Sequence, residues 1–393
     1  MITRMTLESY ELGQGTGPLR GIKVVEIAGI GPSPHACTIL ADLGADVIRV
    51  ERPGGQLLTG GAHDLLNRGR PSVALNLKDP AAAEVVLDLV AGADVLIEGM
   101  RPGVTERLGI GPEACHARNP RLVYGRMTGW GQEGPWSQAA GHDMNYIAIT
   151  GTLHGLGQVK GTPQFPANLV GDFGGGSTYL VIGILAALLE AKVSGQGQVV
   201  DAAIVDGTAH LNTMLAAFLA GNTYKEERVS NLLDGGTPFY SIYETADGEH
   251  MSVGCLEPQF FAAFTELLGV TDTIPGQFEF DRFDEMRALI ASKFKEKTRD
   301  EWCAIFDGTD ACVAPILKFS EAVDHPHMKA REILVEKDGL VQPAPAPRFS
   351  RTEATLGLPP SPRAGAHTRD ALVLWGIEDV DGLIERGVAV QVD

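Results

Sequence analysis

The feature that most restricts the fold is a repeated alternation of short apolar runs and helical segments in the first third of the chain. Residues 22–28 form a near-continuous apolar run that ends at Gly29, the pattern of a buried strand. Pro32 and Pro34 open a helical stretch that closes at Gly44, and residues 46–50 form the next predicted strand. This order of elements is one βαβ unit.

The alternation continues further along the chain. Residues 73–77 alternate as a strand, Asp79 and Pro80 begin a helix that Gly92 stops, and residues 94–98 are again strand-like. A further apolar run follows at residues 122–127. Strands that alternate with helices predict an open, mostly parallel, doubly wound α/β sheet.

The middle of the chain has a different pattern. Residues 239–245 and 250–255 flank an Asp-Gly turn, which predicts a β-hairpin. A Phe-rich helix follows over residues 260–268, and Thr298 with Glu301 has the spacing of a capping box. We therefore expect a smaller α+β domain here.

Composition and charge exclude several classes of protein. Apolar residues make up 44% and charged residues 21%, as in ordinary globular proteins, and the net charge of -18 opposes binding to nucleic acid. The five cysteines are widely spaced and form no CxxC pair, which argues against zinc or redox chemistry and favours reduced thiols. The most apolar stretch, residues 180–189, has about half the length that a bilayer requires, and the N-terminus has no apolar signal region. The sequence thus predicts a cytoplasmic protein without a membrane partner.

Several familiar motifs fail in informative ways. Gly29, Gly31 and Pro34 after the first strand, with Glu51 after the second, imitate a dinucleotide fingerprint, but Pro34 stands where close helix packing requires the third glycine. We therefore expect no NAD. The sequence also has no Walker A, GxSxG or HExxH motif, so the P-loop, serine hydrolase and zincin classes have no support.

From Gly21 onward the chain resembles the class III CoA-transferase (CaiB/BaiF) family. The resemblance rests on GIKVVEI, ADLGADVIRVERPGG, RGRPSVALNLK, DVLIEGMRPGV and MTGWGQEGP, in that order. Three more segments resemble the α-methylacyl-CoA racemase branch: GHDMNY at 141–146, NLVGDFGGG at 168–176 and VGCLEPQF at 253–260. The resemblance implies an acyl-CoA substrate, with coenzyme A as part of it and no prosthetic group or metal.

The resemblance also implies a domain organisation. A Rossmann-like, CoA-binding large domain is expected from residues 1–207, with a linker at 208–238 and the small α+β domain at 239–335. Residues 336–393 would return and complete the large domain. The family further implies an interlocked homodimer, in which large and small domains from different subunits form each active site. The extension before Gly21 matches no family motif, and we expect a flexible lead or an arm on the partner.

The carry-over names His142, Asp172 and Glu257 as the acid/base set, and each has a structural alternative. A lone histidine is often only a hydrogen-bonded residue. Asp172 precedes three glycines and a long apolar helix, where a carboxylate satisfies free N–H groups. Glu257 stands before Pro258 at the head of the Phe-rich helix, where the helix dipole favours an acid.

The resemblance also implies residues that hold the cofactor. CoA carries a 3′-phosphate and a diphosphate, which Arg can bind with a fork of donors and Lys with a compact charge. Taken singly, each basic residue is more often a solvated surface charge. The expected CoA-binding residues are Arg52, Leu75, Lys78, Gly99, Met100, Arg101, Arg107, Gly141, Asp143, Asn145 and Tyr146. The acyl chain is expected against apolar segments such as Leu211 to Leu219.

A racemase must remove the hydrogen at carbon 2 of the thioester and return one to the opposite face. We expect His142, oriented by Glu257, to work on one face and Asp172 on the other, through an enolate that backbone donors near the glycines after Asp172 would stabilise. The alternative is a CoA-transferase in which Asp172 attacks the acyl-CoA as a nucleophile. A third possibility is a catalytically silent CoA-ester binding protein.

Overall fold

The computed structural model describes residues 7, 10–55, 61–159 and 161–392, and the chain divides into two compact units. The large unit runs up to Thr150 and continues through Pro166–Leu211 and from Glu332 onward. The small unit consists of Gly151–Phe165 and Asn212–Arg331. Both chain ends thus contribute to the large unit, while residues 151–165 and the segment 208–238, expected as large domain and linker, mostly belong to the small unit.

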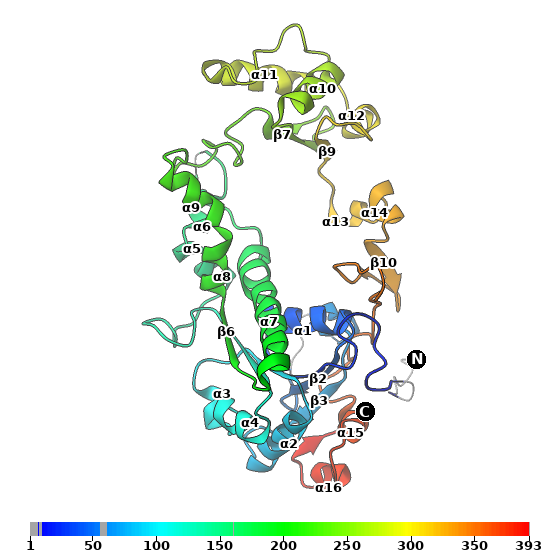
Figure 1. Ribbon diagram of the computed structural model, residues 1–393. Coiled ribbons are helices and arrows are strands. Elements are labelled where there is room, and N and C mark those ends of the chain that lie inside the picture. Colours follow the sequence, from blue (N-terminus) through cyan, green and yellow to red (C-terminus); the bar gives the residue numbers. More distant parts are fainter. Residues whose placement is uncertain (1–6, 8–9, 56–60, 160, 393) are drawn as a thin grey trace. The chain divides into compact units, whose positions relative to one another are not determined.

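The large unit is built on a seven-stranded sheet in the order β12-β3-β2-β1-β4-β5-β6 (Figure 1). All neighbours pair in parallel except β12, which pairs antiparallel with β3. The expected mostly parallel α/β sheet is thereby confirmed. Its strands are β1 (Lys23–Ile27), β2 (Asp46–Glu51), β3 (Ser72–Leu75), β4 (Val95–Glu98), β5 (Val123–Thr128), β6 (Val199–Ala203) and β12 (Ala389–Val390).

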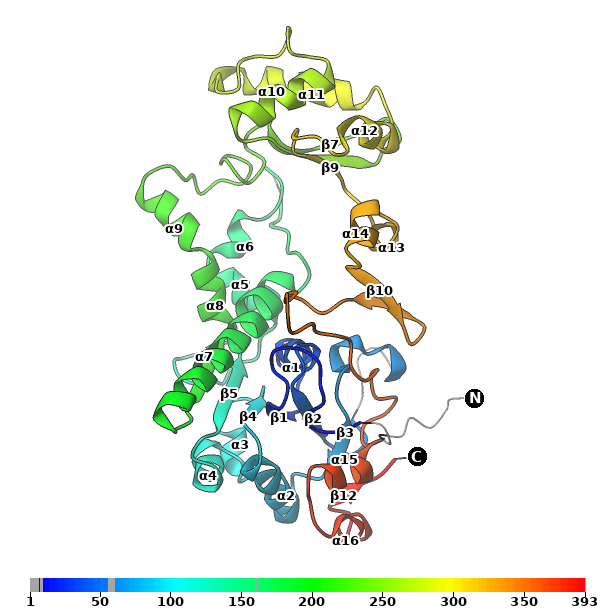
Figure 2. The ribbon, with the colours of Figure 1, turned by 45° about the vertical axis from the view of Figure 1, so that its right-hand side comes forward.

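Helices cover both faces of this sheet, as Figures 1 and 2 show. One apolar cluster joins the sheet to α2 (Pro80–Ala91), α4 (Pro112–Arg118), α15 (Thr368–Leu374) and α16 (Val380–Glu385). A second cluster joins the other face to α1 (Pro32–Asp42) and α7 (Thr178–Ser194). The remaining elements of the unit are α3 (Val104–Arg107), α5 (Asp143–Ile149), η3 (Leu169–Ser177), α8 (Ile204–Leu211), the 3₁₀ turns η1 (Gly61–His63) and η2 (Leu65–Asn67), and the hairpin β10 (Leu334–Lys337) and β11 (Leu340–Pro343).

Local sequence explains why these elements begin where they do. Asp79 caps α2 by accepting a hydrogen bond from the N–H of Ala81 at 3.0 Å, and Pro80 fills the first helical position. Pro32 and Pro34 open α1 in the same way. The strand order reverses between β1 and β4, so the carboxyl ends of these two strands border the crevice where open α/β sheets bind ligands.

A long helix begins at the site described below. It begins with the π-helical segment η3 and continues as α7, so that Leu169–Ser194 forms 26 helical residues. By length and composition alone this helix could cross a membrane, and it is longer than the apolar stretch recognised in the sequence. Leu180 and Ile184 are fully buried against the sheet, whereas Ile182 and Leu189 on the same helix are exposed.

The small unit packs helices on one face of a three-stranded antiparallel sheet. Its strands are β7 (Tyr240–Glu244), β8 (His250–Gly254) and β9 (Val313–Pro315), which confirms the expected hairpin. The capping box at Thr298 and Glu301 is also present. Its helices are α6 (Thr152–Gly155), α9 (Thr213–Ala220), α10 (Pro258–Leu268), η4 (Phe280–Arg282), α11 (Phe283–Phe294), α12 (Arg299–Phe306), α13 (Phe319–Ala322) and α14 (Pro326–Ala330).

The lead before Gly21 packs on the large unit over its described part. The N–H of Gly13 donates to Asp46 at 2.8 Å, and the N–H of Leu19 donates to the carbonyl of Leu43 at 3.0 Å. Gly44 has a φ of 98° and lies so close to the carbonyl of Thr16 that no side chain fits between them. The expectation of a flexible lead or partner arm is therefore wrong for residues 10–20, and residues 1–6 and 8–9 lie outside the described residues.

Candidate active site

A pocket of about 590 Å³ opens at the carboxyl ends of β1, β4 and β5 in the large unit. The loops that follow these strands form its walls, and His142, Asn168 and Asp172 complete it. It thus occupies the switch point where the strand order reverses. Of the predicted residues, those that line it are Gly99, Met100, Arg101, Gly141, His142, Tyr146 and Asp172.

Asp172 lies in the first turn of the long helix, which is the position expected for a carboxylate at a helix start. Its Oδ2 accepts a hydrogen bond from Nδ2 of Asn168 at 3.2 Å and faces Gly31, where an added Cβ would come within 3.0 Å of the same oxygen. Burial raises the pKa of Asp172, and the nearby charge of Asp143 adds to the rise. A carboxyl group of this kind exchanges protons nearer to neutral pH than a solvated one does.

His142 precedes α5 and is exposed. Its backbone N–H donates to Oδ1 of Asn145 at 3.0 Å, which fixes the start of α5. The His142 side chain is close enough to Asp172 to favour the charged form of that carboxylate. The structure therefore places two of the three predicted acid/base residues at one pocket.

The three glycines after Asp172 have a packing role that the sequence did not reveal. A Cβ on Gly175 would lie 2.4 Å from Oγ1 of Thr208 in α8, and one on Gly176 would lie 3.2 Å from Pro32 of α1. Gly174 faces Leu169 and Leu211. The glycines therefore allow neighbouring helices to approach η3 closely, and contact of their backbone with a ligand stays a prediction.

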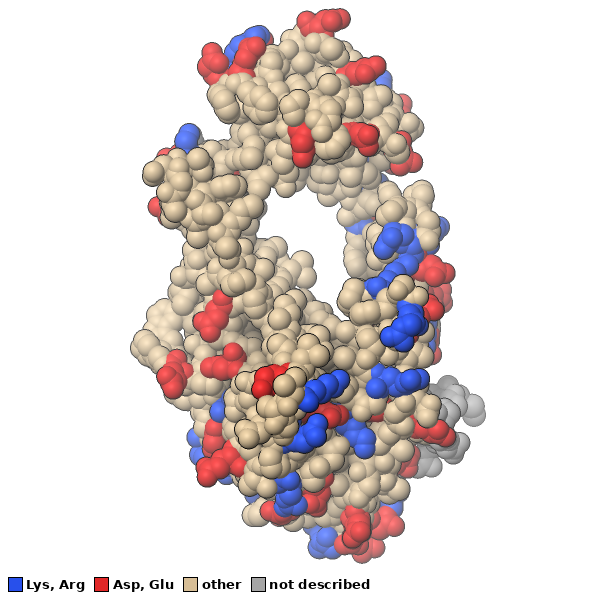
Figure 3. All heavy atoms as spheres, in the orientation of Figure 1, with Lys and Arg blue, Asp and Glu red and all other residues tan. Residues whose placement is uncertain are grey.

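The predicted CoA-binding residues divide into two groups. Arg101 lines the pocket, whereas Arg52, Lys78 and Arg107 are exposed and are not among the described residues that line it. Leu75 is fully buried within β3, in the apolar cluster of the sheet. Basic and acidic side chains alternate over the face of the large unit drawn in Figure 3, so the acidic composition does not produce a uniformly acidic surface there.

Side chains of the segment 141–146 are engaged mainly with the protein itself. The hydroxyl of Tyr146 donates to the carbonyl of Gly141, and Asn145 accepts from His142. Oδ2 of Asp143 accepts a hydrogen bond from the N–H of Asp172 at 2.7 Å. Burial raises the pKa of Tyr146 to about 12, helped by the charge of Asp172. These contacts give the segment a structural role beside any contact with a ligand.

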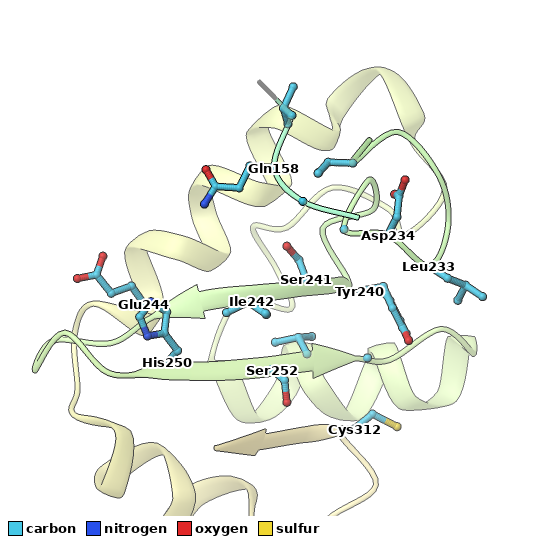
Figure 4. Close-up of a pocket in the computed structure, with 16 residues that line it drawn as sticks. Gln158, Leu233, Asp234, Tyr240, Ser241, Ile242, Glu244, His250, Ser252 and Cys312 are labelled. Carbon is cyan, nitrogen blue, oxygen red and sulfur yellow. The ribbon is translucent and has the colours of Figure 1, made fainter. Parts of the chain in front are cut away.

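Glu257 lies in the small unit, where it is the exposed N-cap of α10. Its charge contributes to a raised pKa of the Cys312 thiol, which burial raises first. Cys312 lies at the edge of a hollow of about 1180 Å³ over the open face of the small sheet (Figure 4). Ile242, 60% exposed, and Ser252 also line this hollow. The pairing of Glu257 with His142 remains a prediction, because the two residues belong to different units.

Asn168 was missed as a site residue by the sequence analysis. It stands four positions before Asp172 within the segment already quoted for the family resemblance. Four residues is the spacing at which side chains meet on one face of a helix, and this signal was available in the sequence.

These features define an α/β protein with a switch-point pocket that holds a partly buried carboxylate and a histidine. The chain belongs to CoA-transferase family III, whose model matches residues 19–368, and within the family it falls with the α-methylacyl-CoA racemases. It is 44% identical to the alpha-methylacyl-CoA racemase of Mus musculus over 91% of this chain and 93% of that protein. The succinyl-CoA:glutarate CoA-transferase of Homo sapiens is 29% identical over 90% and 85%.

Solved structures show the same fold. A CaiB/BaiF family protein from Brucella suis is 26% identical, with a TM-score of 0.80 over 92% of this chain and all of that one.

Proposed function

We propose that the protein is a racemase of 2-methylacyl-CoA thioesters that inverts carbon 2 through an enolate. The observation that carries the proposal is that His142 and Asp172 line one pocket, so that two proton carriers are available to one substrate carbon. Similarity to the racemase branch supports the same reaction. General acid–base catalysis by positioned groups contributes typically 10²- to 10⁴-fold each.

In the proposed reaction one base takes the proton from carbon 2 and the other returns a proton to the opposite face. The raised pKa of Asp172, caused by burial and by Asp143, suits a carboxyl group that must both give and take a proton. The negative oxygen of the enolate needs electrostatic stabilisation, and the helix that begins after Asn168 brings the positive end of its dipole to this pocket.

The substrate requires an anion-binding surface for its phosphates and an apolar surface for its acyl chain. Arg101 is the predicted basic residue that lines the pocket. We further propose that Glu257 of a second subunit completes the site in a homodimer, since Glu257 is exposed in the other unit of the chain, and that the enzyme is cytoplasmic.

The second candidate is a CoA-transferase that uses Asp172 as a nucleophile. Its support is the family itself, which includes transferases such as the human relative. A transferase has no evident need for a second base, whereas His142 stands beside Asp172 in the pocket. The lower identity to the transferase relative also favours the racemase.

The test uses one enantiomer of a 2-methylacyl-CoA in D₂O without an acceptor acid. We expect deuterium to enter at carbon 2 while the optical purity of the thioester falls. Mass spectrometry measures the deuterium, and chiral chromatography measures the optical purity. Absence of exchange, with CoA transfer appearing once a carboxylic acid is added, would assign the protein to the transferases. Absence of both reactions, with CoA esters still bound, would support the silent binding protein.

A further inference from the structure

Asp143 connects the segment that carries His142 to the segment that carries Asp172. It is the first residue of α5 and is only 5% exposed. Oδ2 accepts a hydrogen bond from the backbone N–H of Asp172 at 2.7 Å, and the N–H of Gly171 also stabilises the carboxylate. Oδ1 is buried and has no hydrogen-bond partner among the described residues. The carboxylate therefore binds the backbone of η3, away from solvent.

This contact replaces the cap that η3 lacks in its own sequence. The first four N–H groups of a helix have no partner within it, and Asn168, at the N-cap, makes no side-chain capping hydrogen bond. Gly171 and Asp172 are the third and fourth residues of the helix, so Asp143 binds N–H groups of the first turn from a neighbouring segment.

The contact also requires glycine at position 171. A Cβ there would lie 2.4 Å from Oδ2 of Asp143 and 3.0 Å from Cγ2 of Ile147 in α5. These distances are shorter than ordinary van der Waals contact, so any larger residue would separate α5 from η3. Gly171 and Asp143 thus form a matched pair that holds the two segments together.

We propose that Asp143 is a positioning residue that sets the separation between His142 and Asp172 by capping, from α5, the helix that carries Asp172. The proposal rests on the proposed function, because the separation matters only if both residues act on one substrate carbon. A shift of about 1 Å at a catalytic group can reduce the rate about 10²-fold. Loss of the cap should therefore lower kcat far more than it changes KM.

The negative charge of Asp143 also affects the pKa of Asp172, independently of the hydrogen bonds. It raises the pKa of Asp172 in addition to burial, while His142 and the Asn168 hydrogen bond oppose the rise. Tyr146 of α5 lines the same pocket and also lies within electrostatic range of Asp172. Of the histidines on the other helices packed on η3, His35 of α1 binds Ser177 at 2.6 Å and His210 of α8 binds Tyr179 at 2.7 Å.

The experiment compares Asp143→Ala, Asp143→Asn and a control, Asp94→Ala. Asp94 also accepts a backbone hydrogen bond, from Lys23 at 2.8 Å, but does not line the pocket. We expect Asp143→Ala to lower kcat about 100-fold with KM changed less than about threefold. Asp143→Asn keeps one oxygen acceptor, so its kcat should be about tenfold higher than that of Asp143→Ala. Asp94→Ala should retain wild-type kcat per folded molecule.

Two further measurements separate a positioning role from a merely structural one. Asp143→Asn removes the like charge, so the pKa of Asp172 falls and the acid limb of the pH profile of kcat should move to lower pH. An unchanged limb together with wild-type kcat in folded Asp143→Ala would overturn the proposal.

Amide hydrogen exchange at Gly171 and Asp172 tests the cap without reference to activity. It should be faster in Asp143→Ala than in the wild type or Asp94→Ala, and equal rates would also overturn the proposal. If the wild type exchanged no deuterium into carbon 2, the proposed function would fail while this test of the cap remained valid.

Discussion

Asn168 donates a hydrogen bond from Nδ2 to Oδ2 of Asp172 at 3.2 Å, from the residue that immediately precedes the helix. This bond stabilises the charged carboxylate and opposes the burial that raises the pKa of Asp172. Asn168→Ala should therefore raise that pKa further and move the acid limb of the pH–kcat profile to higher pH. Profiles of the wild type and Asn168→Ala, measured with the same thioester, check the direction, and a shift to lower pH would contradict it.

The two proposed bases should be separable by stereochemistry. Asp172→Asn and His142→Gln each remove one proton carrier, so each should lose racemisation by about 10³-fold, within the range of general acid–base catalysis. Each variant should still exchange deuterium into one enantiomer, and the two variants should prefer opposite enantiomers. Mass spectrometry measures the exchange. The control is His116→Gln, because His116 does not line the pocket. Retained racemisation in Asp172→Asn would contradict the assignment.

Arg101 and Arg107 provide a matched pair for substrate binding. Both belong to the segment after β4, but of these two described residues Arg101 lines the pocket and Arg107 does not. Hydrogen bonds to charged groups contribute about 1.5–3 kcal/mol, so Arg101→Gln should weaken binding of the CoA thioester at least tenfold. Arg107→Gln should leave it within about twofold. Calorimetric titration of both variants decides, and equal losses would show that the pocket is not where the phosphates bind.

Gly175 should tolerate no side chain. Its added Cβ would lie 2.4 Å from Oγ1 and 2.6 Å from the backbone nitrogen of Thr208, so α8 must move. We expect Gly175→Ala to destabilise the fold by about 1–3 kcal/mol, as overpacked cores do. Gly92→Ala, where nothing lies within 4 Å of the added Cβ, is the control. Thermal unfolding compares the two, and equal unfolding temperatures would contradict the close packing.

Glu98 should make stability depend on pH. Burial raises its pKa to about 7, against weaker opposition from the N–H of Met100 and from Arg126. Because the unfolded chain releases this proton near pH 4.5, the folded protein binds more protons between pH 4.5 and 7, and its stability falls as pH rises through that window.

Replacing Glu98 by Gln removes this ionisation. Glu98→Gln should therefore gain about 2 kcal/mol relative to the wild type between pH 5 and pH 8. Calorimetric unfolding across this range measures the difference. The exposed Glu113→Gln variant controls for net charge, and a flat difference for Glu98→Gln would refute the prediction.

The elements predicted best are those whose signal is local. The apolar run at β1 and the capping box at Thr298 depend on residues within one element, and the structure has both. The assignment of residues 151–165 to the small unit depends on contacts with segments far along the chain, which periodicity does not encode.

The same distinction applies to the candidate site. The family motifs located His142 and Asp172, and both line the pocket. The close packing of neighbouring helices on the glycines after Asp172 was not predicted, because a glycine's permissive backbone does not reveal which neighbour approaches it. The predicted contact of Asp143 with CoA stays a prediction, and the structure adds that its buried carboxylate binds the N–H of Asp172, a relationship between segments 29 positions apart.

The antiparallel pairing of β12 with β3 aligns Ala389 with Leu75, although more than three hundred residues separate them in the sequence. During synthesis on the ribosome, β3 must therefore wait as an open edge until almost all of the chain has emerged. Unpaired edges invite association with other chains, and long-range pairing is slow. Nascent chains on one messenger RNA are thus most vulnerable to aggregation in that interval. Truncation just before β12 should therefore reduce the yield of soluble protein more than the small number of deleted residues suggests.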